Sequence, residues 1–446
     1  MLIDELIEPR WIVPVEPART TLENHAIALH EGRIIAILPQ EQARSTFQAA
    51  RVTPLHDHLV TPGLINLHTH AAMTLLRGAG DDLPLEQWLR SRIWPVERAL
   101  MSHEFVLAGT RLACLEMLRG GVTCFCDMYF FPDAAAQAVL ECGMRACLGV
   151  PVIDFPTAWA SDPDDYLNKG LAVRDAMRDE PMLSFCLAPH APYTVPDAAF
   201  ARIVTLSEQL GIGISVHLHE TEAEIRDELA RSGTRPIARL DRLGLIGPQL
   251  TSIHSVHMTP NEIALFAQRG VTVAHCPSSN LKLASGIAPV AQLLDANVRI
   301  GLGTDGAASN NRLDVLSEMR LASLLAKGTS GRADIFDVHQ VLHAATLAAA
   351  TALGLEEKIG SIVVGKDADL VAFDLGGLDA QPNFDPVAHL IFVAGREYAS
   401  HVWVHGECVV QKRQFVKEGT LRAAAEGASA VSLWQNRVRL RFGSLH

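Results

Sequence analysis

The chain has 446 residues, which is long for one average domain and sufficient for a large barrel plus an accessory module. Hydrophobic residues make up 48 % and charged residues 20 %, as in an ordinary globular protein, and the formal net charge of −12 excludes a cationic surface for nucleic acid. No apolar run approaches the ~20 residues of a membrane span, and the acidic, proline-broken start MLIDELIEPRWIVPVEP lacks the features of a secretory signal, so we expect a cytoplasmic protein without membrane contact.

The two ends of the chain are predicted to form short β-strands. Near the N-terminus, HAIALHEGRIIAIL alternates apolar and polar residues around a turn at Glu31-Gly32. Near the C-terminus, GSIVVGKDADLVAFDL and HVWVHGECVV have the same character. We expect residues 1–57 and 359–446 to supply the two parts of one small accessory β-sandwich domain, with a tail at the C-terminus.

The middle of the chain, residues 58–358, alternates apolar β runs with helical segments. Such alternation is typical of βα units around a parallel sheet that is buried on both faces. Eight runs are present, at residues 59–70, 121–128, 144–152, 182–190, 211–220, 250–257, 270–277 and 298–306. Eight parallel strands with helices between them predict a closed (β/α)8 barrel of the TIM type. The alternative, a doubly wound open sheet, usually carries a glycine-rich phosphate loop after the first strand, and none follows here.

The eight cysteines show no Cys-x-x-Cys pair, so the sequence predicts neither a zinc knuckle nor a redox motif. Most of them lie in apolar runs, such as Cys147 in RACLGV and Cys186 in LSFCLA. We interpret these thiols as small core residues.

Several apolar runs end in a residue that can bind a metal or transfer a proton. These residues are His68, His70, His190, His217, His219, Glu220, His254 and Asp305. Because the carboxyl ends of barrel strands meet at one mouth, we expect residues more than two hundred positions apart to surround one ion.

Three imidazoles and one carboxylate suit Zn²⁺, with Fe²⁺ as the less specific alternative. His68 and His70 point to the same side of a strand and can bind one metal together. His217 and His219 also share a face, so alternation does not decide which of them is the ligand. A bound ion would lower the pKa of a water molecule to about 7 and supply hydroxide at neutral pH.

The sequence resembles the amidohydrolase superfamily over nearly its whole length. The motifs that carry this resemblance are PGLINLHTH, SVHLHE, HSVHMTPNE, GLGTDGAASNN and IGSIVVGKDADLVAFD. Within the superfamily the chain is similar to the 5-methylthioadenosine/S-adenosylhomocysteine deaminases. This closer similarity rests on LEQWLRSRIWPVE, LAPHAPYT and HCPSSNLKLASGIAPV.

The resemblance implies a role for each candidate residue. The implied ligands of one zinc per subunit are His68, His70, His217 and Asp305. Glu220 is the implied proton shuttle, and His254, rather than His257, is the implied partner of the metal-bound water. Glu97 and His190 are implied to bind the nucleoside through its ribose hydroxyls. The run ending at His190 has no lysine at its end, where two-metal members of the superfamily carry a bridging lysine.

These roles predict hydrolytic deamination of an adenine nucleoside to its inosine analogue. Glu220 protonates N1 of the adenine, Asp305 moves a proton from water to the leaving ammonia, and His254 stabilises the oxygen. Both acids therefore contact substrate. The alternatives are a guanine or pterin deaminase or a triazine hydrolase with the same metal site, and a non-catalytic assembly protein on the same scaffold.

The expected partner is a small nucleoside, with a homo-oligomer as an open alternative. Related sequences can use arginines after the third run to bind substrate. Here that stretch, VIDFPTAWASDPDDY, contains none, so the sequence assigns no partner to a substrate carboxylate.

Overall fold

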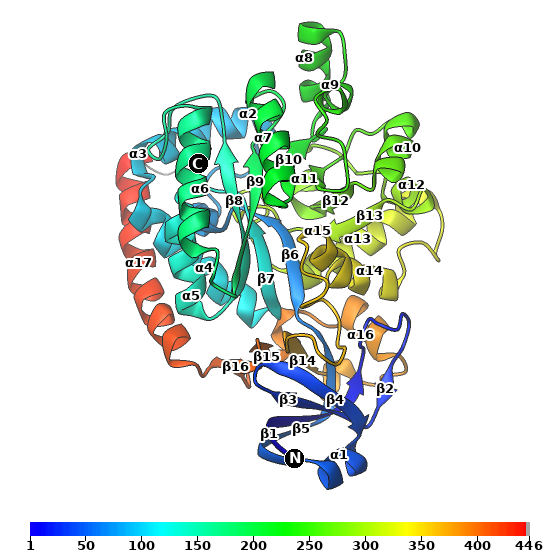
Figure 1. The fold of residues 1–446 in the computed structure, drawn as a ribbon. Helices are drawn as coiled ribbons and strands as arrows, with labels where there is room; N and C mark the ends of the chain where they lie inside the picture. Colours follow the sequence, from blue (N-terminus) through cyan, green and yellow to red (C-terminus); the bar gives the residue numbers. More distant parts are fainter. Residues whose placement is uncertain (443–446) are drawn as a thin grey trace.

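The structure is a computed structural model and describes residues 1–442. Its centre is a sheet of eight parallel strands in the order β13-β12-β11-β10-β9-β8-β7-β6 (Figure 1). The strands are β6 (Leu64–Thr69), β7 (Val122–Asp127), β8 (Arg145–Val152), β9 (Leu183–Pro189), β10 (Ile214–Leu218), β11 (Leu250–His254), β12 (Thr272–His275) and β13 (Arg299–Leu302). Every residue of β6, β7, β8 and β10 is buried, which explains their continuous apolar runs.

Each of the eight predicted runs contains one of these strands, and the predicted barrel fold is confirmed. The first run, 59–70, is divided between two sheets. Its beginning belongs to β5 (Gln48–Pro62) and its end to β6. Gly63 joins them where the chain passes so close to Thr123 that a Cβ atom would lie 2.1 Å from the threonine Oγ1.

Helices connect the strands and cover the outside of the barrel. They are α4 (His103–Arg119), α5 (Pro132–Cys142), α6 (Pro163–Met177), α7 (Asp197–Leu210), α8 (Glu222–Ser232), α9 (Pro236–Arg242), α10 (Pro260–Arg269), α11 (Pro277–Lys282), α12 (Val290–Asp295), α13 (Val315–Ser330), α14 (Val338–Ala344) and α15 (Leu347–Ala352). Ser102, Asp162 and Asp314 accept hydrogen bonds from first-turn amides and so fix the starts of α4, α6 and α13.

The connection after β6 is longer than the others and matters for function. It holds a 3-10 turn (Ala71–Leu76), α2 (Leu85–Trp88), a π-helical turn (Leu89–Ile93) and α3 (Trp94–Leu100). Residues of α2 and α3 line the cavity at the barrel mouth. This segment therefore forms a wall over the carboxyl ends of the strands.

Strands from both ends of the chain form one mixed accessory sheet, as predicted. Besides β5 it contains β1 (Leu2–Ile12), β2 (Leu22–Glu23), β3 (His25–His30), β4 (Arg33–Pro39), β14 (Leu370–Asp374), β15 (Ala399–Val404), β16 (Glu407–Gln411) and β17 (Gln414–Phe415). The order is β17-β16-β15-β14-β5-β1-β3-β4, with β2 beside β1. Only the β1–β5 pair of this sheet is parallel within the described residues. The short helices α1 (Gln40–Thr46) and α16 (Pro386–Phe392) lie in the terminal regions.

The last helix, α17 (Glu418–Phe442), returns to the barrel (Figure 1). Trp434 packs edge-on against Phe105 of α4 with ring centroids 5.1 Å apart, and Thr420 donates a hydrogen bond to the carbonyl of Cys142 at the end of α5. The sequence analysis assigned this segment to the accessory domain and tail without predicting a helix. None of the helices within residues 1–442 has the length and apolar character needed to cross a bilayer.

Candidate active site

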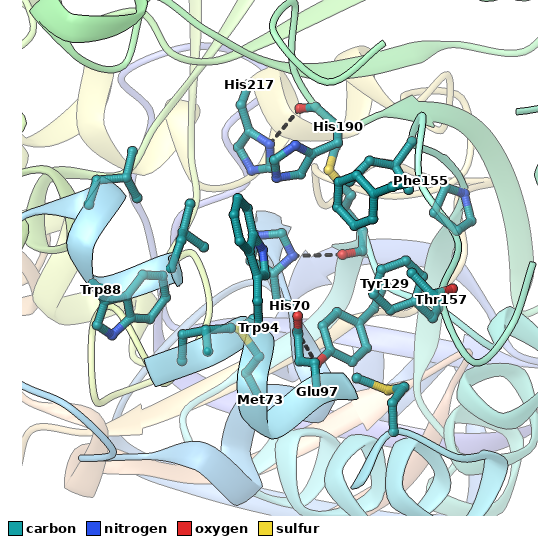
Figure 2. Close-up of a pocket in the computed structure, with 18 of the residues that line it drawn as sticks. His70, Met73, Trp88, Trp94, Glu97, Tyr129, Phe155, Thr157, His190 and His217 are labelled. Carbon is teal, nitrogen blue, oxygen red and sulfur yellow. Dashed lines mark hydrogen bonds between the residues drawn. The ribbon is translucent and has the colours of Figure 1, made fainter. Parts of the chain in front are cut away.

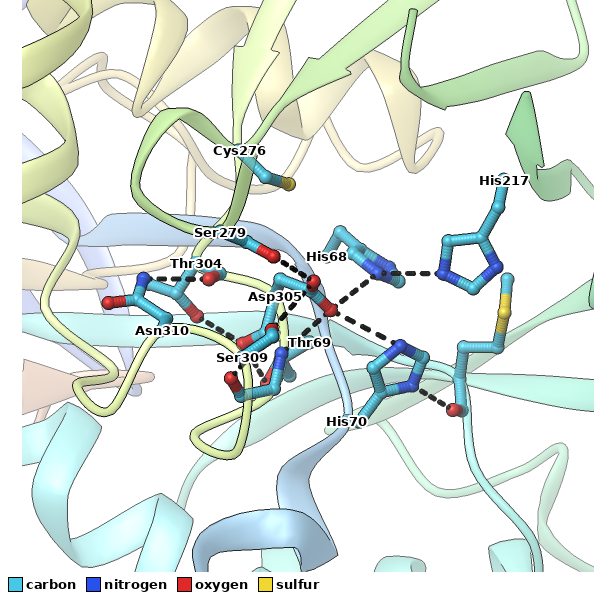
Figure 3. A network of polar contacts seen from close by, with 12 residues as sticks. His68, Thr69, His70, His217, Cys276, Ser279, Thr304, Asp305, Ser309 and Asn310 are labelled. Carbon is cyan, nitrogen blue, oxygen red and sulfur yellow. Dashed lines mark hydrogen bonds and ion pairs between the residues drawn. The ribbon is translucent and has the colours of Figure 1, made fainter. Parts of the chain in front are cut away.

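A cluster of three histidines and one aspartate lies where the barrel strands end (Figure 3). The Nε2 atoms of His68 and His217 are 3.2 Å apart. One carboxylate oxygen of Asp305, Oδ1, lies 3.3 Å from Nε2 of His68 and 3.2 Å from Nε2 of His70. The structure thus brings together four residues that are spread over more than 230 positions of the sequence.

Hydrogen bonds on the far sides of the rings fix how two of the imidazoles face the cluster. The Nδ1 of His70 is 2.6 Å from the carbonyl of Met128, and the Nδ1 of His217 is 2.7 Å from the carbonyl of His190. A carbonyl only accepts, so both Nδ1 atoms carry the proton and donate. Nε2 of His217 therefore directs its lone pair into the cluster, and Nε2 of His70 does the same whenever a cation takes the place of a proton there.

Hydrogen bonds also fix the position of the Asp305 carboxylate. The hydroxyls of Ser279 and Ser309 donate to its Oδ2 at 2.6 and 2.8 Å, and the amide of Gly306 donates to Oδ1 at 2.8 Å. The residue has a left-handed backbone with φ of 62°, three residues after β13 ends at Leu302, and its side chain faces the histidines. Oδ1 remains the atom that faces the imidazoles.

The electrostatics of the cluster fit a bound cation. Burial lowers the pKa of His68 to about 4 and holds that of His217 well below its usual value, so both rings are neutral. Burial also opposes a charge on His70, but the facing carboxylate of Asp305 raises the pKa of this ring to about 9. The carboxylate of Asp305 thus favours a positive charge at this position, which either a proton on His70 or a bound cation supplies. The donor set of imidazoles and one carboxylate is that of zinc.

The geometry distinguishes His217 from His219. His219 takes a left-handed backbone with φ of 53°, and its ring turns away from the barrel mouth. Its Nε2 accepts a hydrogen bond from the amide of Ile237 at 3.3 Å, and its Nδ1 is 3.5 Å from Arg235. Only His217 of the two reaches His68 and His70 in the described structure.

Glu220 and His254 lie beside the cluster. The Nε2 of His254 is 3.8 Å from a carboxylate oxygen of Glu220, and its ring stacks on that of His217 with centroids 5.4 Å apart. Asn280 accepts a hydrogen bond from Nδ1 of His254 at 2.8 Å, which leaves Nε2 on the cluster side. His257 instead contacts the carbonyl of Ser285 at 2.7 Å through its Nε2. His254 is therefore the histidine of this strand end that faces the cluster.

The backbone at Glu220 is fixed by a second acid. Glu224 accepts hydrogen bonds from the amides of His219 and Glu220 at 3.0 and 2.9 Å. Burial raises the pKa of Glu220, and a protonated glutamate beside a reacting group can act as a general acid.

A cavity of about 730 Å³ opens above the cluster (Figure 2). Its floor contains His70, His217, Glu220, His254 and Asp305. Its walls are mostly apolar and aromatic side chains, among them Trp88, Trp94, Met101, Phe130, Ile153 and Phe155. A flat, partly apolar ring with a polar edge facing the cluster would fit this shape.

Glu97 and His190 place two hydrogen-bond acceptors in the cavity wall. The hydroxyl of Tyr129 donates to Glu97 at 2.7 Å, yet burial raises the pKa of this carboxyl to about 7. Thr194 donates to the carbonyl of Ala191 and so accepts from Nδ1 of His190 at 2.8 Å. Burial lowers the pKa of His190 to about 3, so its Nε2 is an acceptor. A ligand with two hydroxyl donors is the natural partner for this pair.

Sequence reasoning missed the residues that hold the site in shape. Tyr129 and Thr194 lie in the loops after β7 and β9, and Asn280 lies in the short helix α11 after β12. Each fixes one candidate residue through a hydrogen bond. The aromatic triplet Tyr129–Phe131 directly after a predicted strand was the one available signal.

Comparison with known proteins identifies relatives of the whole chain. Residues 59–409 match the amidohydrolase family. A 5-methylthioadenosine/S-adenosylhomocysteine deaminase of Saccharophagus degradans is 45 % identical over 411 residues, which are 92 % of each chain. A crystal structure of an adenosine deaminase from Xanthomonas campestris with bound zinc is 47 % identical, covers 98 % of this chain and 99 % of its own, and superposes with a TM-score of 0.95. The triazine-degrading enzyme TrzN of Arthrobacter aurescens, 23 % identical with a TM-score of 0.88 over 96 % of this chain and 100 % of its own, shares the fold.

Proposed function

Because this chain belongs to the amidohydrolase family, we propose that its histidine–aspartate cluster holds one zinc ion per subunit and serves the deamination of adenine nucleosides. The enzyme is a metal-dependent deaminase of 5-methylthioadenosine and S-adenosylhomocysteine. The observation that carries this function is the convergence of His68, His70 and His217 in a chain that is 45 % identical to a deaminase of these nucleosides over 92 % of both lengths.

The residues of the cluster bind the cation, and Asp305 also takes part in proton transfer. His68, His70, His217 and Asp305 hold the cation. The bound cation supplies Lewis-acid activation of water at neutral pH. The two oxygens of Asp305 have different partners. Oδ2 accepts hydrogen bonds from the hydroxyls of Ser279 and Ser309, and Oδ1 faces the reaction space.

Three residues move or stabilise charge during the reaction. Protonated Glu220 donates to N1 of the adenine, which makes C6 electrophilic. Asp305 accepts a proton from the attacking water and passes it to the leaving amino group. His254, protonated on both ring nitrogens, donates from Nδ1 to Asn280 and directs its Nε2–H at the oxygen, where it stabilises the negative charge that develops. Overall, the water oxygen becomes the C6 carbonyl oxygen and the C6–N bond breaks. One water proton leaves with ammonia, and the other returns to Glu220 in place of the proton that it gave to N1.

The acceptor pair of Glu97 and His190 positions the sugar. Ribose offers two neighbouring hydroxyl donors, and the carboxylate of Glu97 and Nε2 of His190 both accept. Neither group contacts the reacting C6 atom in this arrangement. Their interactions therefore contribute to binding the ground state and the transition state alike.

Glu97→Gln is expected to raise KM for 5-methylthioadenosine by about 10- to 100-fold, the range for a lost hydrogen bond to a charged group, with kcat nearly unchanged. Because burial raises the pKa of Glu97 to about 7, its carboxylate is lost as pH falls through that value. The wild-type KM should rise below about pH 7, and the Glu97→Gln profile should lack this rise. Steady-state kinetics across this pH range measure both effects.

An exposed glutamate of the same segment, Glu86, provides the control for the Glu97 experiment. Glu86→Gln should keep the wild-type KM and its pH dependence. If Glu97→Gln has the wild-type KM, or if its KM still rises as pH falls, Glu97 does not bind the sugar.

The cavity walls predict a preference between the two nucleosides. The methylthio group is apolar and suits walls of Trp88, Trp94 and Phe155, whereas the homocysteine group brings an ammonium and a carboxylate that must leave water. Arg98 is the one lysine or arginine among the residues that line the cavity. We expect kcat/KM for 5-methylthioadenosine to exceed that for S-adenosylhomocysteine by at least about tenfold, a difference of roughly 1.4 kcal/mol.

Arg98→Ala should increase the difference in kcat/KM between the two nucleosides. It should lower kcat/KM for S-adenosylhomocysteine several-fold and leave that for 5-methylthioadenosine unchanged. Equal turnover of both nucleosides by the wild type would contradict the preference without affecting the chemistry.

Ammonia release tests the proposed function directly. The purified holoenzyme is assayed with 5-methylthioadenosine, S-adenosylhomocysteine, adenosine, guanine and a triazine. Turnover of the adenine nucleosides with formation of the inosine analogue is the expected result. Turnover of guanine or the triazine alone would overturn the substrate assignment.

A further inference from the structure

Three buried cysteines form a compact cluster away from the catalytic residues. Cys126 of β7, Cys147 of β8 and Cys186 of β9 come from three neighbouring strands, and their Sγ atoms all lie within 4.8 Å of one another. None is more than 5 % exposed. The interpretation of these cysteines as core residues is correct for their burial, but it did not anticipate that they meet.

The cluster lies inside the barrel, below the mouth. Its thiols line a cavity of about 20 Å³ together with side chains from β6, β10 and β11, including Leu67, Ser215 and Thr251, and with Leu353 after α15. On β9, Cys186 precedes His190 by four residues, which is roughly 13 Å along an extended strand. The two clusters share no residue, and Ser215 precedes His217 by two residues on β10.

The spacing of the thiols matches that of a trigonal metal site. The Sγ atoms of Cys126 and Cys186 are 4.0 Å apart, well beyond the ~2.05 Å of a disulfide. Three sulfurs at about 2.3 Å from one central ion stand about 4.0 Å from one another in a planar arrangement. The Cys126–Cys186 distance has this value, and the distances to Cys147, within 4.8 Å, can reach it with small side-chain shifts.

A fourth polar group lines the same cavity without a partner. Ser215, on the next strand β10, is 4 % exposed, and its hydroxyl makes no hydrogen bond within the described residues. A buried hydroxyl without a partner costs about 1–3 kcal/mol. The Ser215 hydroxyl would gain a partner if it donated a hydrogen bond to a charged thiolate, or to a fourth ligand of a bound ion.

The chemistry of the cluster selects a soft cation. Hydrogen bonds from the thiols of Cys126 and Cys186 hold the pKa of Cys147 well below its usual value, so this thiol ionises first. A divalent ion that displaces all three thiol protons leaves a group with one net negative charge. One that displaces two leaves a neutral group. Among the side chains that line the cavity, a hard cation would find only the hydroxyl oxygens of Ser215 and Thr251.

We propose that Cys126, Cys147 and Cys186 form a second metal site for a thiophilic d¹⁰ cation such as Zn²⁺ or Cd²⁺. Binding forms three metal–sulfur bonds and releases two or three protons to solvent, without oxidation or reduction. The ion would join β7, β8 and β9 inside the barrel, so its role is structural and independent of the deamination.

Cadmium provides a probe that tells the two sites apart, since thiolate–Cd²⁺ bonds give an ultraviolet charge-transfer absorption that imidazole and carboxylate ligands do not. The reduced zinc holoenzyme is titrated with Cd²⁺, and a second sample is refolded in its presence so that slow entry into the closed barrel is not limiting. We expect the absorption to saturate at one Cd²⁺ per chain with release of two or three protons. Cys147→Ala should weaken this binding by at least about 100-fold, the loss of one of three charged ligands.

Cys124→Ala is the matched control, because Cys124 is a fully buried cysteine on β7 two residues before Cys126 and outside the cluster. It should keep the absorption and the stoichiometry. Cys126→Ala provides a second test if Cys147→Ala does not fold, and deaminase activity of each variant reports folding. Absence of the absorption in both wild-type samples, or its persistence in Cys147→Ala and Cys126→Ala, would overturn the proposal.

Discussion

Glu220→Gln should reduce kcat for 5-methylthioadenosine by about 10²- to 10⁴-fold, the usual contribution of one general acid. Glutamine keeps the shape of the side chain but has no proton that it can transfer to N1 of the adenine. The metal content and KM should change little, because Glu220 is not a ligand of the cluster and its backbone is held by Glu224. Steady-state kinetics and metal analysis of the same preparation measure these quantities.

Glu222→Gln is the control for this prediction. Glu222 is on the same turn, and its side chain is 88 % exposed, so its replacement should leave kcat within about twofold of the wild type, as for an ordinary surface substitution. A Glu220→Gln enzyme with more than a tenth of the wild-type kcat would exclude Glu220 as the proton donor.

The second large effect concerns the metal. His217→Ala should hold one zinc ion fewer per chain than the wild type, and kcat/KM should fall more than about 10³-fold, because the Lewis-acid contribution of several kcal/mol disappears with the ion. His219→Gln, two residues later, should keep the zinc and most of the activity. Its glutamine can still accept the hydrogen bond from the amide of Ile237.

Elemental analysis and kinetics of these two variants should be read together. If His219→Gln loses the metal while His217→Ala retains it, the ligand set proposed above is wrong. If both retain the metal, the ion is held elsewhere.

Much of the fold followed from the sequence because its signals are local. An apolar run that is buried on both faces has a recognisable composition, and all eight strands lie inside the predicted runs. The metal cluster also followed, since barrel strands carry their carboxyl ends to one mouth whatever their distance along the chain. His68 and Asp305 could therefore be placed together before their contact was seen.

Other features of the site and the fold depend on backbone geometry, which the alternation of apolar and polar residues in the sequence does not reveal. His217 and His219 have the same parity, and what separates them is the left-handed backbone of His219, which ends the strand and turns the ring away. Tyr129 lies in a loop and Asn280 in the short helix α11, and the sequence pattern does not fix how either segment faces the site. The helix α17 was missed because its apolar stripe is interrupted by charged and small residues.

The cysteine cluster illustrates the same limit. Each thiol alone has the signature of a core residue, and only the register between strands, with Cys126 opposite Cys147, brings them together. Register depends on how the whole barrel closes, so it could not be derived from the separate runs.

A crystal structure of the holoenzyme with anomalous diffraction data at the zinc edge tests the central claim most directly. We predict one strong anomalous peak at the barrel mouth, about 2.0–2.2 Å from Nε2 of each ligand histidine and from Oδ1 of the aspartate. The histidines are His68, His70 and His217, and the aspartate is Asp305. A catalytically active crystal without a peak at this position, or with a peak that these four residues do not share, would contradict the account.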